Sequence, residues 1–178
     1  GPSADYCQRA LIRQIDIVCP DLVLCGLPMA DRIEDYGPDR AESYVVSGID
    51  LDRLEEAPIP VQGFVDLYNP HFGRMNLARN LLGIQMLCRL RGIAHLTLSQ
   101  ELRPQLFATP ILRPVFDQID HDRVLLHRYF RNRPDRAADG RHAGPRTHEG
   151  VAIAALGRLG EVIAAEGDRD RGARISAH

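Results

Sequence analysis

The first apolar positions of the chain recur every three or four residues, which is the period of an amphipathic helix. Ser3 is a residue type that caps helix N-termini, and Pro20 interrupts the pattern. We therefore expect a helix between Ser3 and Pro20. Its apolar side is formed by Tyr6, Ala10, Leu11, Ile15 and Val18, and its polar side by Arg9, Arg13, Gln14 and Asp16.

An almost wholly apolar run follows at residues 21–26 and closes on a glycine. A run this short and this apolar is typical of a strand buried on both faces, which favours a parallel sheet. Ligands of open parallel sheets bind at the carboxyl ends of the strands, so the next residues are candidates for a pocket wall. We name Gly26, Asp31 and Arg32 as candidate substrate-binding residues. The alternative is an ordinary turn with a surface Asp/Arg pair.

Residues 33–73 are rich in acidic side chains and contain several prolines. Their hydrophobic positions follow neither the helix nor the strand period over any length. Long loops of compact domains are usually functional or mobile, so this segment is either a lid or rim of the pocket or a plain surface excursion. At its end, residues 68–72 read Tyr-Asn-Pro-His-Phe. Their aromatic and amide groups either contact a ligand or pack within the loop.

The helical period returns at Arg74 and continues to Arg91. Gly92 follows, and glycine most readily takes the left-handed conformation that ends many helices. Residues 93–99 are again short and apolar, so we expect the next parallel strand there. His95 lies within this strand, where a histidine is either a packed core residue or a catalytic one.

Prolines at positions 104, 110, 114 and 134 limit the elements of residues 100–136 to short pieces. Residues 117–120 are expected to begin a brief helix or to form the last strand edge, and residues 124–126 to supply core side chains. The pattern then predicts a final helix over residues 145–165, with Pro145 in its first turn. The polar residues 166–178 are expected to form a disordered tail.

The 178 residues are 44% hydrophobic, enough for one core, and we expect a single α/β domain over residues 1–165. The 22 basic residues are all arginine and nearly balance 24 acidic ones, and a net charge of −2 gives no basic face for a nucleic-acid partner. No apolar run approaches the roughly 20 residues that span a bilayer, and no signal peptide is present. We therefore expect a cytoplasmic protein without a membrane partner, whose four cysteines, without CxxC spacing, are reduced.

The stretch with the most chemistry lies just before the final helix, where Asp139 precedes His142 by three residues in a Gly/Pro-rich turn. A carboxylate beside an imidazole fixes its tautomer and leaves the other ring nitrogen available as a general base. We therefore assign His142 as the candidate catalytic base and Asp139 as the group that orients it. A zinc site of Asp139, His142 and His148 is an alternative, although no HExxH pattern is present and the final helix would turn His148 away. We expect neither a metal nor a cofactor.

The order helix, strand, long loop, helix, strand and a late Asp-x-x-His before the last helix resembles the SGNH (GDSL-like) hydrolase superfamily. Residues 20–24 followed by Gly26, and the sequence Gly144-Pro145-x-x-His148, also look like this family. The resemblance covers most of the chain and implies a flavodoxin-like three-layer sandwich with a parallel sheet. It also implies a Ser-His-Asp triad in which Asp139 is the acid and His142 the base.

The family's Gly-Asp-Ser nucleophile block is absent from this sequence. Its Gly-x-Asn-Asp block is absent too, since Gly26 is followed by Leu-Pro-Met-Ala-Asp. The chain begins about where the family's second block would lie. We therefore expect an enzyme shortened at its N-terminus, with the serine outside this stretch, or half of a split enzyme, or a domain that has lost catalysis. Ser3 and Cys25 are alternative nucleophiles within it, although Ser3 is also a plausible N-cap and Cys25 lacks a basic neighbour.

In the family's sheet order, 2-1-3-4-5, the nucleophile strand is central. If strands 1 and 2 are missing, residues 22–24 form an exposed apolar edge, which is a template for pairing with another chain. We therefore expect a homo-oligomer or a partner chain that completes the sheet.

The first functional hypothesis is an SGNH-like domain that hydrolyses a small-molecule ester or transfers its acyl group. The second is a non-catalytic module of the same fold that binds a ligand or a partner chain. The third is a general α/β domain whose Asp-x-x-His is coincidental. The acyl group and the alcohol are not predicted, because such pockets are formed by loops that vary freely on one fold.

Overall fold

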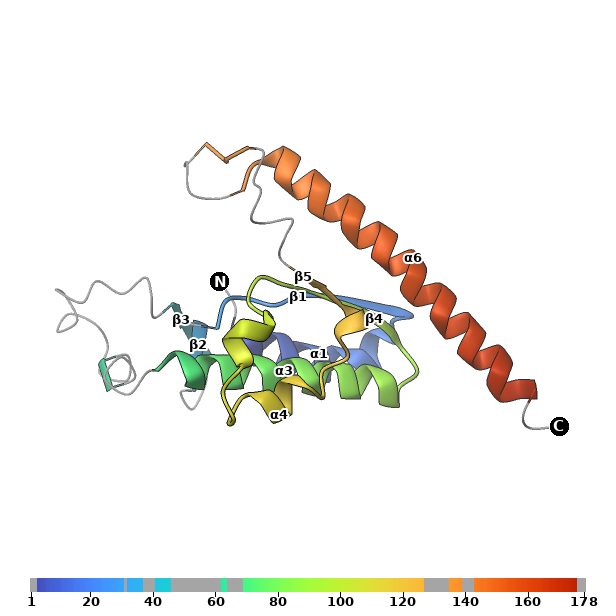
Figure 1. Cartoon of the computed structure of the whole chain (residues 1–178), viewed down its shortest axis with the longest axis horizontal. Coiled ribbons are helices and arrows are strands. Elements are labelled where there is room, and N and C mark those ends of the chain that lie inside the picture. The colour runs from blue at the N-terminus through green and yellow to red at the C-terminus, as the bar shows by residue number, and fades with distance from the viewer. Residues whose placement is uncertain are drawn as a thin grey trace.

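The structure is a computed structural model, shown as a ribbon in Figure 1. It describes residues 3–30, 32–36, 41–45, 62–63, 69–126, 135–138 and 143–175, with only the backbone described at 32–36, 41–45, 126 and 166–175. Its elements are α1 (Ala4–Val18), β1 (Leu22–Gly26), β2 (Arg32–Tyr36), β3 (Ala41–Val45), α3 (Pro70–Leu90), β4 (Ala94–Ser99), η3 (Pro104–Phe107), α4 (Arg113–Phe116), η4 (His121–Arg123), β5 (Val124–Leu126) and α6 (Pro145–Ile175).

Three strands form a parallel sheet in the order β1-β4-β5, so β4 is its central strand. Leu24 of β1 lies opposite Leu96 of β4, and Ser99 of β4 lies opposite Leu126 of β5. The chain is therefore of the α/β class, as the sequence predicts. β2 and β3 form a separate antiparallel pair, although the sequence predicts no strand in residues 33–73.

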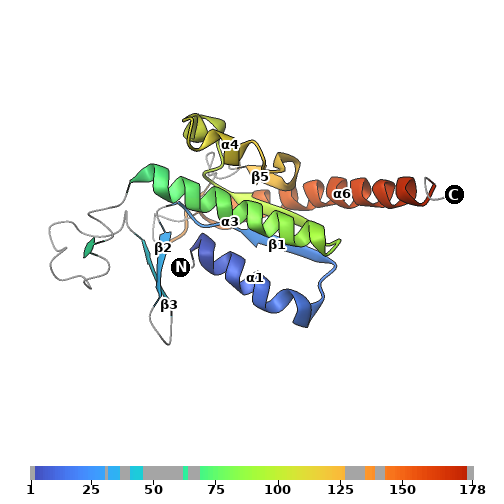
Figure 2. The ribbon, with the colours of Figure 1, turned by 90° about the horizontal axis from the view of Figure 1, so that it is seen from below.

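Helices cover both faces of the parallel sheet. α1 and α3 lie side by side on one face, and α6 crosses the other face over β4 and β5 (Figures 1 and 2). Parallel strands need long crossover connections, and α3 provides the one between β1 and β4. The described part of the chain therefore has three layers.

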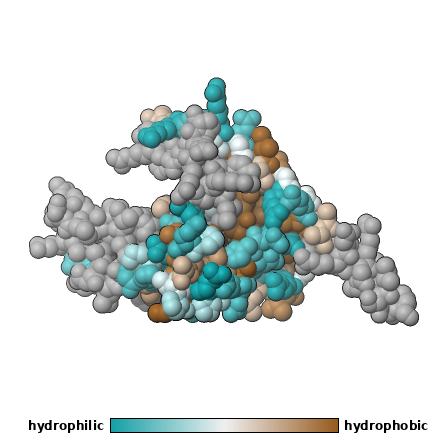
Figure 3. All heavy atoms as spheres, in the orientation of Figure 1, coloured by the Kyte–Doolittle hydropathy of each residue, from teal (hydrophilic) through white to brown (hydrophobic). Residues whose placement is uncertain are grey.

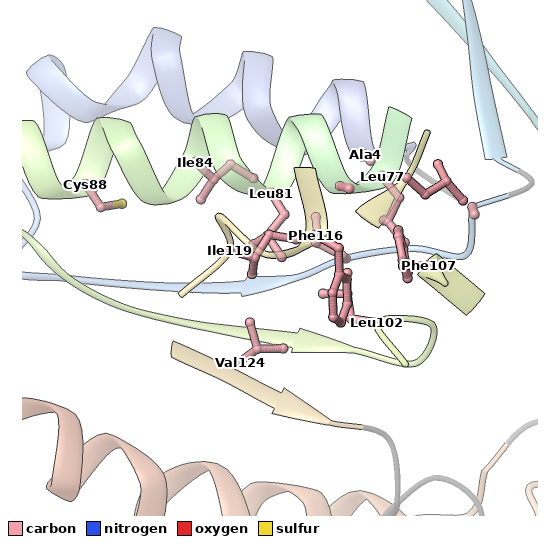
Figure 4. Packing of buried hydrophobic residues seen from close by; sticks show 14 residues of the cluster. Ala4, Leu77, Leu81, Ile84, Cys88, Leu102, Phe107, Phe116, Ile119 and Val124 are labelled. Atoms are coloured by element: carbon pink, nitrogen blue, oxygen red, sulfur yellow. The ribbon is translucent and has the colours of Figure 1, made fainter. Parts of the chain in front are cut away.

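The main core lies between the sheet and the layer formed by α1 and α3. Figure 4 shows Leu77, Leu81 and Ile84 of α3 pointing from the helix towards the sheet, as their spacing of three and four residues requires. Phe107 and Phe116 stack beside them with ring centroids 4.7 Å apart. The cluster also contains Ala4, Leu27, Ala30, Ala78, Cys88, Leu102, Leu112, Ile119 and Val124.

Gly83 of α3 faces the side chain of Gln8 on α1. A Cβ atom at this position would lie 1.9 Å from Nε2 of Gln8, so the Gln8 side chain occupies the space that a larger residue would need. Asp5 of α1 accepts hydrogen bonds from the side chains of Asn76 (2.7 Å) and Asn80 (3.1 Å) of α3. The helix pair is therefore held by polar contacts as well as by the core.

Two predicted helix ends are confirmed. Oγ of Ser3 accepts a hydrogen bond of 3.1 Å from the backbone N–H three residues on, so Ser3 is the N-cap of α1. Gly92, just past α3, has a φ of +64°. α3 begins at Pro70, earlier than predicted, because Oδ1 of Asn69 accepts from the N–H of Phe72 at 2.9 Å and caps the helix.

The prediction that the first strand is buried on both faces is wrong. In the described part of the chain β1 pairs only with β4, which makes it an edge strand. Val23 and Cys25 pack against the core, whereas the side chains on the other face are exposed, Leu22 by 36% and Leu24 by 53%. An apolar run looks the same whether its second face is covered or open, so the sequence pattern does not distinguish the two cases.

α6 begins at Pro145, as predicted, and continues to Ile175, past the predicted end at Ala165. Its inner side packs on the sheet through the buried residues Val151, Ala155 and Val162. Its outer side carries the exposed apolar residues Ile153, Leu156 and Ile163. In Figure 3 hydrophobic surface runs along α6 and onto the sheet beneath it.

None of the helices in the described ranges has an apolar stretch that is long enough to cross a lipid bilayer.

Candidate functional site

The carboxyl ends of β1, β4 and β5 lie at one edge of the sheet, because the three strands are parallel. The loop after β1 is fastened there to the end of β4. The N–H of Leu27 donates to the carbonyl of Leu98 at 2.9 Å, and the N–H of Ala30 donates to Oε2 of Glu101 at 2.9 Å. Residues 26–30 therefore have a fixed position at the edge where ligands of open parallel sheets bind.

Gly26, the last residue of β1, is exposed at this edge, and a Cβ atom there would meet nothing within 4 Å. The site prediction for Gly26 therefore rests on its position alone. Asp31 lies outside the described residues. Arg32 begins β2, where its backbone pairs with Val45 and its side chain is not described.

Sequence reasoning missed Glu101, which connects the loop after β1 to the end of β4. Its own N–H donates to Oγ of Ser99 at 3.3 Å, so the glutamate follows the last residue of β4 in a short turn. The hydrogen bond that its side chain accepts from Ala30 connects two residues that lie 71 positions apart in the sequence. No local pattern reports such a contact.

Asp135 binds the segment that precedes α6 to the first turn of this helix. Its carboxylate accepts from the backbone N–H groups of Arg146 and Thr147 and from Oγ1 of Thr147, each at 2.9 Å. The N–H of Gly144 donates to the backbone carbonyl of Asp135 at 3.3 Å. Asp135 thus caps the N-terminus of α6 from outside the helix, where the helix dipole also favours a negative charge.

These contacts change the pKa of Asp135. Partial burial alone would raise it, but the hydrogen bonds from Arg146 and Thr147 and the positive charge of Arg146 together bring the pKa of Asp135 below its usual value. Asp135 is therefore a carboxylate at neutral pH.

Gly144 and Pro145 suit this junction. A Cβ atom on Gly144 would lie 2.5 Å from Oδ2 of Asp135, so only glycine leaves room for the capping carboxylate. Pro145 is the first residue of α6, a position where the missing N–H of proline costs nothing. His148 is exposed on the first turn of the helix.

Asp139 and His142, the predicted catalytic pair, lie outside the described residues. The chain on either side of them is described, and Arg136 and Ala143 form an antiparallel bridge. Asp135 and Thr147 therefore hold together the two ends of the segment that contains the predicted acid and base.

Three of the four cysteines converge between α1, β1 and α3. Hydrogen bonding to Cys7, burial, and the nearby Cys7 and Cys88 thiols all raise the pKa of the Cys25 thiol strongly. Burial also raises the pKa of Cys88 to about 11. A thiol that resists ionisation is a poor nucleophile, so the interpretation of Cys25 as a catalytic nucleophile loses its chemical basis.

The structure also describes the surroundings of Ser3 and His95, two further candidate residues from the sequence. Ser3 is fully buried and its hydroxyl caps α1, which does not suit a nucleophile. His95 is 5% exposed within β4, as expected of a packed histidine. Among the described residues, no group of three or more His, Cys, Asp or Glu side chains is arranged to hold a metal ion.

Two surface pockets lie at the opposite, amino end of the sheet. One, of about 270 Å³, lies between η4 and the second half of α6, and the other, of about 230 Å³, lies where the chain enters β1 and β4. Arg158 lines the first, but it already binds Asp122 (3.2 Å) and Glu161. These pockets are therefore separate from the carboxyl edge.

Searches of protein-family models, of curated proteins and of solved structures found no match to this chain.

Proposed function

We propose that this chain forms most of an SGNH-like ester hydrolase or acyltransferase domain whose nucleophilic serine is supplied from outside this stretch. The observation that carries the proposal is the path of the chain around the sheet. The order β1-β4-β5, with α1 and α3 on one face and α6 on the other, matches the last three strands of a flavodoxin-like sheet of order 2-1-3-4-5. The connection from β5 to α6 contains Asp139 and His142.

The part of the sheet that no described element covers supports the same proposal. Leu22 and Leu24 of β1 are exposed on the face that α6 only partly covers, and the outer side of α6 is apolar as well. In a complete sandwich a further strand would pair with β1, and a further helix would cover its outer face beside α6. A serine at the carboxyl end of that strand would lie at the same edge as the segment between β5 and α6.

In this mechanism the serine oxygen attacks the ester carbonyl while His142 takes its proton as general base. His142 then returns the proton to the departing alcohol, which leaves an acyl-enzyme. Water or a second alcohol attacks this intermediate in the same manner and releases an acid or a new ester. Asp139 orients the imidazole, and Asp135 holds the ends of the segment that carries both residues. Gly26, Asp31 and Arg32 belong to the rim of the substrate pocket.

In the part of the chain that the structure describes, one edge of β1 is unpaired. This edge favours a second candidate function, a non-catalytic module of the same fold that binds a partner chain through this strand. The two candidates differ in one sequence feature. The enzyme requires a Gly-Asp-Ser block in the native gene upstream of this stretch, whereas the module does not.

The test is labelling of the native protein, including any upstream segment, with a fluorophosphonate probe that reacts with activated serines. We expect a single adduct by intact mass, its loss in His142→Ala, and its retention in His148→Ala, the matched control on the exposed first turn of α6. Absence of an adduct on the native protein would reject the enzyme and favour the module.

A further inference from the structure

The side of α3 that faces away from the core is largely apolar, yet it is exposed. Phe72 is 53% exposed, Met86 52% and Leu90 80%. They recur at intervals of 14 and 4 residues, so they share one side of the helix. Arg79 lies midway between Phe72 and Met86 and is exposed on the same side. The outer side of α3 therefore combines three large apolar side chains with a positive charge.

α1 has an outer side of the same kind. Tyr6, Arg13 and Ile17 recur at intervals of 7 and 4 residues and are all exposed, Tyr6 by 47% and Ile17 by 76%. The buried residues Ala4 and Ile15 lie on the opposite side of the helix, towards the core. Both helices of this layer thus present apolar and arginine side chains away from the sheet.

The two outer sides form one continuous face, because α1 and α3 lie side by side along their length (Figure 2). Contacts at both ends hold the pair together: Asp5 with Asn76, and Asp16 with Arg91. Ile17 and Leu90 are the neighbours in sequence of Asp16 and Arg91, so they lie close to each other at the end of the layer. We call this surface the basic apolar face; it consists of Tyr6, Arg13, Ile17, Phe72, Arg79, Met86 and Leu90.

The layer is basic although the whole chain is not. Residues 4–18 and 70–91 contain six arginines and two acidic residues, a net charge of +4, whereas the net charge of the chain is −2. Both acidic residues are already bound within the layer, Asp5 by the amide of Asn76 and Asp16 by Arg91. Among the described residues, Arg13 and Arg79 form no ion pair. Their charges are therefore available to an anionic partner.

We propose that the basic apolar face binds the surface of an anionic lipid membrane, with Ile17 and Leu90 inserted between the lipids and Arg13 and Arg79 at the headgroup phosphates. Surfaces with this combination of exposed apolar side chains and arginines bind membranes that carry negative lipids. Charge complementarity selects this partner, because a second copy of the face would bring like charges together. The phosphates of a nucleic acid, in turn, would leave the apolar side chains in water.

The inference is independent of the proposed acyl chemistry. It differs from the expectation that the protein has no membrane partner, which rests on the absence of a long apolar run. Binding to a membrane surface needs no such run. It depends on which side chains two separate helices place on one face, and neither helix shows this face alone.

The first test uses the fact that the chain contains no tryptophan, so a single introduced indole reports on its own position. Leu90→Trp is mixed with vesicles of phosphatidylcholine alone, or with vesicles that also contain phosphatidylglycerol. We expect a blue shift of the tryptophan emission with the anionic vesicles, a smaller shift at high salt, and none with the neutral vesicles. Ile153→Trp is the matched control, because Ile153 is 64% exposed but lies on α6, and its emission should not shift.

Sedimentation with the same vesicles measures the affinity. Arg13→Gln combined with Arg79→Gln should weaken binding roughly 25-fold, about fivefold for each arginine removed. Arg136→Gln combined with Arg146→Gln removes the same charge from exposed residues near the start of α6 and should leave binding unchanged. Equal weakening by the two pairs would overturn the assignment to this face, and so would a blue shift of Ile153→Trp instead of Leu90→Trp. Equal binding to neutral vesicles, or no binding to either kind, would overturn the proposed partner.

Discussion

Asp135 is the residue whose contacts most directly affect the candidate site. Its role at the start of α6 predicts that the folding stability of the protein depends on pH. The folded-state pKa of Asp135 is lowered, so its contribution to stability is fully present above the pKa of the unfolded chain, about 3.9, and is lost as the pH falls through the lower folded value. Asp135→Asn should therefore lower the urea midpoint at pH 7, and the difference from the wild type should shrink below about pH 4.

The measurement is urea unfolding followed by circular dichroism at several pH values. Asp117→Asn is a suitable control, because Asp117 pairs with Arg113 on the surface and caps no long helix. A destabilisation by Asp135→Asn that is equally large at pH 3 and pH 7 would mean that the charge of Asp135 does not stabilise the cap.

Gly144 gives a second prediction at this junction. Gly144→Ala places a Cβ atom 2.5 Å from the carboxylate of Asp135, so either the cap or the backbone must move, at a cost of about 1–3 kcal/mol. Gly150→Ala, one turn into α6, meets nothing within 4 Å and should stabilise the helix by up to about 1 kcal/mol. Thermal unfolding of both variants measures the two changes in stability. Equal changes would contradict the close approach of Gly144 to the Asp135 carboxylate.

Residue-scale features could be predicted from the sequence where both partners are close along the chain. Ser3 accepts from the backbone N–H of the residue three positions later and so caps α1. Gly92 takes a positive φ directly after α3. The bond from Thr147 to Asp135 spans 12 residues, and that from Ala30 to Glu101 spans 71. Such contacts depend on how the chain returns to itself, which residue types alone do not specify.

At the scale of elements, neighbouring residues of α6 test how the helix docks on the sheet. Val162 is 4% exposed and Ile163 is 54% exposed. Val162→Ala should cost about 2 kcal/mol through lost burial and a cavity, whereas Ile163→Ala should change stability by at most about 0.5 kcal/mol. Denaturant unfolding measures both values. The reverse order would mean that α6 lies on the sheet in another rotation.

The helices were the most predictable elements, because the three- and four-residue period is a local property of the sequence. The ends of α3 and α6 differ from the predictions, since Asn69 starts α3 early and the helix of α6 runs on to Ile175. The strand at β1 and its unpaired edge could be predicted, the edge from the missing first strands of the family's sheet. The exposure of its second face could not, because that depends on which elements cover the sheet. The hairpin of β2 and β3 lacks a clear alternating pattern and was not predicted.

At the scale of the whole molecule, the edge of β1 with which no described strand pairs predicts that the isolated chain associates. β1 contains no charged residue or proline that would discourage pairing, and its own Leu24 is 53% exposed. α6 carries further exposed apolar residues, Ile153, Leu156 and Ile163, and Figure 3 shows hydrophobic surface along this helix. Exposed patches of this kind bind other chains or copies of themselves.

We expect light scattering after size exclusion to show a mass that rises with protein concentration, and Leu24→Lys to shift it towards the monomer. Because Leu24 is already half-exposed, the lysine should leave the fold and its circular dichroism unchanged while it adds a charge to the edge. Leu90→Lys, an exposed change on α3, should leave the association unchanged, since α3 lies on the other face of the sheet. A wild-type chain that stays monomeric at every concentration would mean that the edge of β1 is covered within the chain itself.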